Sequence, residues 1–177
     1  VAGGGSFLKW RAPAPRRVLY IDGEMPAVTL QERLQNIGRK AEAHPSGDAL
    51  AVMAADMGEF GVPDLSTPEA QNALMPMLAP YDLIVLDNLS TLCRSGRENE
   101  AESWTTVQGF ALALRRAGKS VLFVHHAGKT GAQRGTSRRE DVLDSVLLLK
   151  RPDGYDAKQG ARFIVQFDKA RGFTGDA

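Results

Sequence analysis

An α/β fold built on a mainly parallel sheet is predicted for this chain of 177 residues. Short, unbroken apolar runs, such as VLYI at 18–21 and LIVL at 83–86, are typical of strands that are buried on both faces of a parallel sheet. Amphipathic segments separate these runs. This alternation of strand and helix predicts a sheet with helices on both faces.

The first strand and helix are predicted within residues 17–38. Residues 17–22 (RVLYID) form the strand. Pro26 suits the first turn of the following helix, because its missing N–H is not needed there, and Gly38 suits the end of that helix. Apolar side chains recur between them at helical spacing, at Leu30, Leu34 and Ile37.

A second strand is predicted at residues 49–54, followed by a loop. The sequence Ser-Thr-Pro-Glu at 66–69 indicates a helix start, because it supplies an N-cap hydroxyl and a proline in the first turn. This helix is expected to run to about Leu78, since Pro80 cannot continue it.

The alternation continues in the second half of the chain. Residues 82–89 (DLIVLDNL) predict a buried strand, residues 102–117 an amphipathic helix and residues 121–124 another apolar strand. Gly118 is a plausible C-cap for the helix.

Two last strands are predicted at residues 142–150 and 161–169. The stretch between them, PDGYDAKQG, is rich in turn-forming residues, and this favours an antiparallel hairpin. No internal repeat and no long linker interrupts the chain. We therefore expect one domain over residues 1–177.

Bulk composition excludes several classes of protein. The formal net charge of +1 produces no global field toward nucleic acid or membranes, so any basic site must be local. A single cysteine, Cys93, excludes an internal disulfide framework and favours the cytoplasm. No apolar run approaches the roughly 18 residues of a membrane span. The start at Val1 lacks the features of a signal peptide and suggests a fragment or a processed product.

Polar side chains follow three of the predicted strands. Residues 22–24 (DGE), 87–88 (DN) and 125–126 (HH) lie where their strands end. Ligands of a parallel α/β sheet bind outside the carboxyl ends of its strands. We therefore expect the functional site at these three positions.

Two carboxylates are the candidates for nucleotide chemistry. Asp87 ends an apolar strand, as the Walker B aspartate does when it holds Mg²⁺, often through water. Glu24 is placed to activate a water that attacks a terminal phosphate. The alternatives are structural: Asp87 as a turn cap, and Glu24 as a solvated loop residue or a charge favoured by a helix N-terminus.

The paired histidines allow three interpretations, of which the simplest is structural, with one histidine in the core and one exposed. In the second, one histidine contacts a terminal phosphate, and Asp87, Asn88 and His125 are the expected nucleotide-contacting residues. A metal-dependent hydrolase that uses Asp22, Asp87 and His125 is a remote alternative, because adjacent strand residues point to opposite faces.

A basic segment, residues 128–139, is the candidate contact with nucleic acid. Its glycines predict a loop, it contains no acidic or aromatic residue, and its cations suit a phosphate backbone rather than stacked bases. The alternative is a solvated basic loop. The cations are Lys129, Arg134, Arg138 and Arg139.

The phosphate-binding pattern G-x-x-x-x-G-K-[ST] does not occur in the chain. Two fragments, GKS at 118–120 and GKT at 128–130, copy only its tail. The first glycine of each pattern would fall on Ala113 or Phe123.

Five motifs in this order resemble the RecA-like hexameric ATPases, in particular the RepA helicase group of plasmid and phage replication proteins; DnaB-type helicases are more distant. The motifs are VLYIDGEM (18–25), YDLIVLDNLSTL (81–92), VLFVHHAGK (121–129), RGTSRREDVLDSVLLLK (134–150) and FDKARGFTG (167–175).

The resemblance implies a fold, cofactors and residue roles. The fold is a RecA-like P-loop NTPase core, and the cofactors are ATP and Mg²⁺. Glu24 matches the catalytic glutamate, Asp87 the Walker B aspartate and His126 the γ-phosphate sensor, with His125 as its less favoured substitute. Lys169 and Arg171 match a K-x-R pair that reaches the nucleotide of the neighbouring subunit as an arginine finger.

The departure from the family is the Walker A loop, which we expect before Val1 together with the first strand and helix. Residues 1–177 are then a single partial RecA-like ATPase domain that binds ATP weakly or not at all. The expected parent is a cytoplasmic, ring-forming motor on single-stranded DNA. The alternatives are a RecA-like regulatory ATPase without unwinding and a non-catalytic module that binds DNA or a partner.

Overall fold

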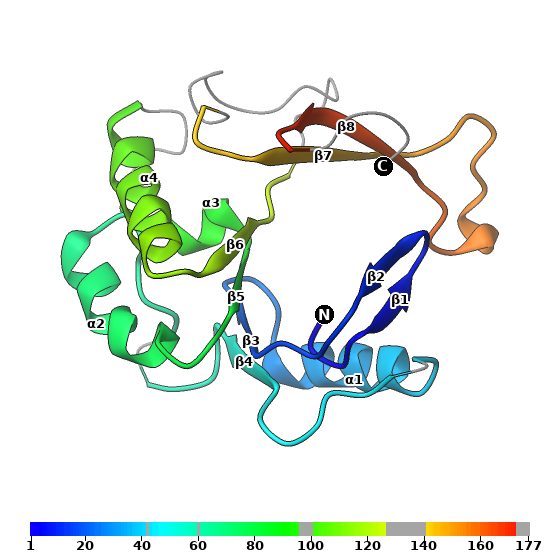
Figure 1. The fold of residues 1–177 in the computed structure, drawn as a ribbon, viewed down its shortest axis with the longest axis horizontal. Helices are drawn as coiled ribbons and strands as arrows, with labels where there is room; N and C mark the ends of the chain where they lie inside the picture. The colour runs from blue at the N-terminus through cyan, green and yellow to red at the C-terminus, as the bar shows by residue number, and fades with distance from the viewer. Residues whose placement is uncertain (42, 60, 96–100, 127–140, 173–177) are drawn as a thin grey trace. The chain divides into compact units, whose positions relative to one another are not determined.

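A computed structural model describes residues 1–41, 43–59, 61–95, 101–126 and 141–172 (Figure 1). The chain divides into two compact units, Val1–Thr136 and Ser137–Ala177. The first unit has an α/β fold, and the second is built on a β-hairpin. Each unit is described by itself, and the single domain expected from the sequence stays a prediction.

The first unit is centred on a four-stranded parallel sheet. Its strands are β3 (Val18–Asp22), β4 (Leu50–Ala54), β5 (Leu83–Asp87) and β6 (Ser120–Phe123). Their order is β4-β3-β5-β6, and every neighbouring pair is parallel. The four apolar runs of the sequence are therefore strands of one parallel sheet, as predicted.

Helices cover both faces of this sheet. One face carries α1 (Ala27–Gly38), and the other carries α2 (Pro68–Leu78) and α4 (Ala101–Arg116) (Figure 1). Alternate strand residues point to opposite faces, so Leu19 and Ile21 of β3 face the α2 and α4 side. This arrangement confirms the prediction of a sheet with helices on both faces.

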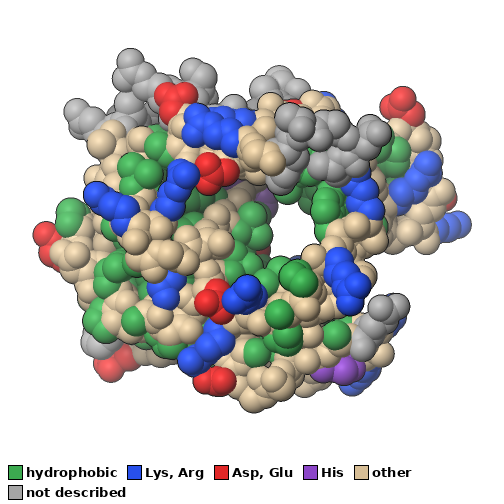
Figure 2. Space-filling model, viewed as in Figure 1, with side chains coloured by type: hydrophobic (Ala, Val, Ile, Leu, Met, Phe, Trp, Pro, Cys, Tyr) green, Lys and Arg blue, Asp and Glu red, His purple; other side chains and the backbone are tan. Residues whose placement is uncertain are grey.

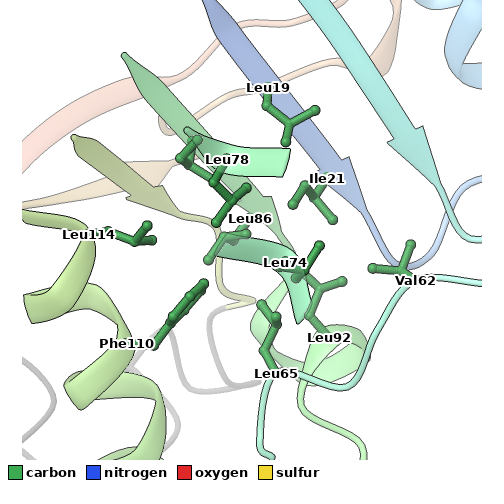
Figure 3. Packing of buried hydrophobic residues seen from close by; sticks show 11 residues of the cluster. Leu19, Ile21, Val62, Leu65, Leu74, Leu78, Leu86, Leu92, Phe110 and Leu114 are labelled. Atoms are coloured by element: carbon green, nitrogen blue, oxygen red, sulfur yellow. The ribbon is translucent and has the colours of Figure 1, made fainter. Parts of the chain in front are cut away.

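The main hydrophobic cluster lies between the sheet and the helices α2 and α4 (Figure 3). Leu86 of β5 and Leu114 of α4 are both 0% exposed. Leu74 and Leu78 are spaced four residues apart on α2, which puts both side chains on its buried face. Ile37 of α1, in contrast, is 65% exposed, so the apolar stripe predicted for α1 is buried chiefly at Leu30.

The start of α2 and the end of α4 are set by the capping residues that the sequence predicts. The hydroxyl of Thr67 accepts a hydrogen bond from Ala70 N at 3.3 Å, so it caps α2. Gly118 follows α4 with φ +75°, and its N–H donates to Arg115 O at 2.9 Å. A residue with a Cβ rarely adopts this backbone conformation, and this explains the glycine.

Two elements differ from the predictions. The strand predicted at 82–89 ends at Asp87, because Asn88 caps a short helix, α3 (Leu89–Leu92), by accepting a hydrogen bond from Thr91 N at 3.2 Å. A short hairpin of β1 (Gly5–Phe7) and β2 (Trp10–Ala12) was not predicted. Its strands have three residues each, too few to show an alternating pattern.

The second unit contains the predicted antiparallel pair. Strands β7 (Ser145–Lys150) and β8 (Ile164–Ala170) pair with a register shift at Val146/Leu147. The turn-rich connection includes a short 3₁₀ helix, η2 (Ala157–Gln159), capped by the Asp156 carboxylate.

Charges of both signs are interspersed on one face of the protein. On the face drawn in Figure 2, the described Lys and Arg side chains are scattered among other types rather than gathered in one patch. In the described part of the chain, no helix combines the length and the hydropathy that crossing a membrane requires.

One carboxylate, Asp64, ties the loop before α2 to the segment after α3. It accepts hydrogen bonds from Ser66 N (3.0 Å), Arg94 N (3.0 Å) and Ser95 N (2.7 Å), and also from the hydroxyls of Ser66 and Ser95. Burial alone would raise the pKa of Asp64, but these hydrogen bonds favour the ionised form and hold the pKa well below its ordinary value of 3.8.

We predict that Asp64→Asn destabilises the fold at neutral pH by on the order of 1 kcal/mol, because charged acceptors make the stronger hydrogen bonds. The folded-state pKa is depressed, so the advantage over Asn is fully present above pH 3.8 and is lost as the pH falls below that value. Urea unfolding of both proteins at neutral pH and at about pH 3 checks this. Asp153→Asn, at an exposed turn, is the control. A constant difference between the wild type and Asp64→Asn at both pH values would contradict the prediction.

Candidate functional site

The ends of three neighbouring strands meet at one edge of the parallel sheet. Asp22 of β3 lies in register with Asp87 of β5. Gly23 N donates to Asp87 O at 2.7 Å, and Val124 N donates to Leu86 O at 2.9 Å. These backbone bonds carry the pairing past the last strand residues. They bring the turn after β3, the start of α3 and the histidines after β6 together, as the sequence predicts.

The turn after β3 is shaped by a buried carboxylate. Asp22 is 2% exposed, and its Oδ1 accepts hydrogen bonds from Glu24 N (2.8 Å) and Met25 N (2.7 Å). Gly23 packs against α3 so closely that a Cβ there would lie 2.6 Å from Thr91 Oγ1 and 2.8 Å from a methyl carbon of Leu92. The turn therefore presents Glu24 at a defined place.

Glu24, Asn88 and His126 form one polar cluster. Asn88 Nδ2 donates to Glu24 Oε2 at 2.6 Å and lies 3.1 Å from His126 Nε2. His126 Nε2 and Glu24 Oε2 are 3.4 Å apart. The side chains of Glu24 and His126 are 58% and 68% exposed, so both are open to solvent and to a ligand. Residues separated by 38 to 102 positions in sequence thus share one site.

Asn88 is 1% exposed, and its amide faces protein atoms on both sides. The sequence-based expectation placed it among the nucleotide contacts. The partners of its side chain in the structure are Glu24, His126 and Thr91, and the nucleotide contact stays a prediction.

Asp87 has a partner that the sequence did not predict. The hydroxyl of Tyr20, two residues before Asp22 on the same face of β3, donates to Asp87 Oδ2. Burial, and next the hydrogen bond to Asp87, raise the pKa of Tyr20 above its ordinary value, so the phenol keeps its proton and stays a donor. Of the described residues, Tyr20 is the one whose side chain donates to Asp87, and its bond is to Oδ2.

His125 is half-buried beside the exposed His126. The metal-hydrolase alternative requires Asp22, Asp87 and His125 to converge. Within the described ranges, no three His, Cys, Asp or Glu side chains are grouped so that they could hold a metal ion.

The two candidate finger residues lie at the end of β8 in the second unit. Lys169 is in the strand, opposite Val146, and Arg171 follows it. Arg171 N donates to Asp144 O at 2.7 Å, and its guanidinium donates to Asp141 O at 3.1 Å. The predicted nucleic-acid contacts Lys129, Arg134, Arg138 and Arg139 lie outside the described residues, so they stay predictions.

Sequence reasoning missed the residues that support the site. Tyr20 was counted only as part of an apolar run, although it is the one polar-tipped side chain in that run. Gly23 and Thr91 left no signal, because their roles depend on α3 packing against a turn that is distant in sequence.

Carboxylates at the carboxyl ends of the central strands β3 and β5, with histidines after β6, lie where ligands of parallel α/β sheets bind. The crystal structure of the RadB recombinase has the same RecA-like fold. It matches over 89% of this chain and 70% of its own, with a TM-score of 0.57 and 14% sequence identity.

A family model described as an AAA domain matches residues 1–132, which is more than half of the chain. The chain belongs to this family. No curated protein matches it in sequence.

We predict that Asp22→Ala loosens the turn that carries Glu24. The change leaves two backbone N–H groups without their acceptor, at a cost of about 1–3 kcal/mol. Asp22→Asn keeps an acceptor oxygen and is the matched control. Amide hydrogen exchange at Glu24 and Met25 should be faster in the Ala variant and close to wild type in the Asn variant. Equal exchange in the two variants would show that these hydrogen bonds do not hold the turn.

Proposed function

We propose that this chain is the core of an ATP-hydrolysing motor that acts on DNA, of the RepA helicase type. The observation that carries the proposal is the cluster of Glu24, Asn88 and His126 beside Asp87 at the carboxyl edge of the sheet. Membership of the AAA domain family supports the ATPase class. The structural likeness to a recombinase supports DNA as the substrate.

The roles follow from exposure and chemistry. Glu24, exposed and ionisable, accepts the proton of a water that attacks the terminal phosphate. Asp87 would hold Mg²⁺ through water, while the Tyr20 hydroxyl donates to its Oδ2. His126, also exposed, contacts the terminal phosphate. Bound Mg²⁺ neutralises the charge that develops on the phosphates.

The residues present fit only one side of a bound nucleotide. The carboxylates and His126 suit the metal and the terminal phosphate, whereas the G-x-x-x-x-G-K-[ST] pattern for the other phosphate contacts does not occur in the 177 residues. The proposal therefore includes a phosphate-binding loop supplied in addition to these residues. It also includes weak or absent ATP binding by residues 1–177 alone.

ATP hydrolysis by the protein with every residue its gene encodes, measured with and without single-stranded DNA, tests the proposal. Stimulation by DNA is the expected result. Strand separation on a forked substrate then distinguishes a helicase from a regulatory ATPase. Absence of turnover would favour a module that binds DNA or a partner without catalysis.

We predict that Glu24→Gln in that protein lowers kcat by roughly 10²–10⁴-fold while nucleotide binding persists. Glutamine keeps an oxygen for the Asn88 amide but cannot take a proton from water. Single-turnover hydrolysis and binding of a fluorescent nucleotide are the measurements. Glu32→Gln, on the exposed side of α1, should behave as wild type. Normal turnover by Glu24→Gln would remove this residue from the catalytic role.

The proposed motor hydrolyses ATP at subunit interfaces of a hexameric ring, where Arg171 and Lys169 of one subunit act on the nucleotide of the next. Arginine suits this role because its planar fork stays charged and binds phosphate through two donors. The basic segment 128–139 is the proposed contact with single-stranded DNA, through Lys129, Arg134, Arg138 and Arg139.

We predict that Arg171→Ala alone lowers turnover by roughly 10³–10⁵-fold. Mixing Arg171→Ala subunits with Glu24→Gln subunits should restore part of the activity, because some interfaces then combine an intact finger with an intact base. Mixtures that stay as inactive as the separate variants would place both residues in the same subunit's site.

A further inference from the structure

Asn88 lies between the two side chains to which the proposed function assigns the chemistry. Its Nδ2 is 2.6 Å from Glu24 Oε2 and 3.1 Å from His126 Nε2. Glu24 and His126 are more than half exposed, whereas Asn88 is 1% exposed. Two exposed groups are therefore held by one buried amide, whose polar atoms must find partners within the protein.

The partners of this amide fix which way it points. Its Oδ1 receives the N–H of Thr91 at 3.2 Å, and a backbone N–H can only donate. Its Nδ2 faces the carboxylate of Glu24, which accepts when ionised. The reversed amide would place an oxygen against the carboxylate and an NH₂ group against an N–H. Both neighbours therefore require the same orientation.

This orientation determines the proton on His126. One Nδ2 proton goes to Glu24, and the other faces His126 Nε2, which must then offer a lone pair and cannot carry a proton. The neutral ring consequently carries its proton on Nδ1. The competing arrangement, in which Nε2–H donates to Glu24, has the longer separation of 3.4 Å, to an oxygen that already accepts from Asn88.

We propose that Asn88 is a positioning residue that holds Glu24 and fixes His126 as the Nδ1–H tautomer. The amide lies closer to His126 Nε2, at 3.1 Å, than Glu24 Oε2 does, at 3.4 Å. Glu24 thus retains its capacity to accept a proton, and His126 presents Nδ1–H as its donor. The catalytic meaning rests on the proposed function, but the tautomer follows from the geometry alone.

Three variants separate this role from the capping of α3. Asn88→Asp keeps a favoured N-cap residue but replaces the amide donor with an acceptor. Asn88→Ser also keeps a capping oxygen and removes the amide. Thr91→Ala is the matched control: it removes the hydroxyl of the same capping box but leaves the Thr91 N–H and the Asn88 amide in place.

Nitrogen-15 spectra of labelled histidine in the 177-residue chain, recorded above the ordinary histidine pKa of about 6.5, report the tautomer without nucleotide or turnover. A His126→Gln variant identifies the signals of His126 among the three histidines of the chain. The wild type and Thr91→Ala should show the Nδ1–H form. Asn88→Asp should show the Nε2–H form, and Asn88→Ser should lose the preference for Nδ1–H. An Nε2–H ring in the wild type, or spectra unchanged by both Asn88 variants, would overturn the proposal.

The activity of the protein encoded by the whole gene gives a second readout. Asn88→Asp should lower kcat on the order of 10²-fold with little change in KM, whereas Glu32→Gln, on the exposed side of α1, should not. If Glu24→Gln leaves turnover intact while the tautomers behave as expected, the proposed function fails and the positioning by Asn88 stands. If Glu24→Gln abolishes turnover and Asn88→Asp does not lower kcat, the positioning role fails by itself.

Discussion

The in-register pairing of β3 with β5 is the constraint on which the site depends. It places Asp22 beside Asp87, and the hydrogen bond from Gly23 N to Asp87 O extends the pairing into the turn that follows. A shift of this register by one residue would turn Leu19 and Ile21 away from the main core. The same shift would move Asp22 to the opposite face of the sheet and out of register with Asp87. Core packing and site geometry therefore select the same register.

The site has a buried polar layer beneath an exposed one. Asp22 and Asn88 are buried and Tyr20 is half-buried, and all three make hydrogen bonds to protein atoms that orient neighbouring groups. Glu24 and His126 lie above them in contact with water. Such support restricts the positions of the exposed side chains before any ligand arrives, which is how proteins lower the reorganisation that a reaction requires.

The sequence predicted the elements whose signals are local or periodic. The runs VLYI and LIVL identified two of the parallel strands, and Thr67 and Gly118 marked helix ends by their own chemistry. The strand tips identified Glu24, Asp87 and His126 as neighbours. Tyr20, Gly23 and Thr91 were not predicted, because their roles depend on contacts between segments that are distant in sequence. The strands of the β1–β2 hairpin were too short to show the alternation of apolar and polar residues that predicts a strand.

The close packing of Gly23 on α3 has a mechanical consequence. A Cβ at Gly23 would lie only 2.6 Å from Thr91 Oγ1, so the turn and α3 are in direct contact and leave no room for a side chain. The chain after α3 is in turn bound by Asp64 through Arg94 and Ser95. Direct contacts thus connect the turn before α1, the four-residue helix α3 and the loop before α2, so a shift of α3 would reach the backbone next to Glu24.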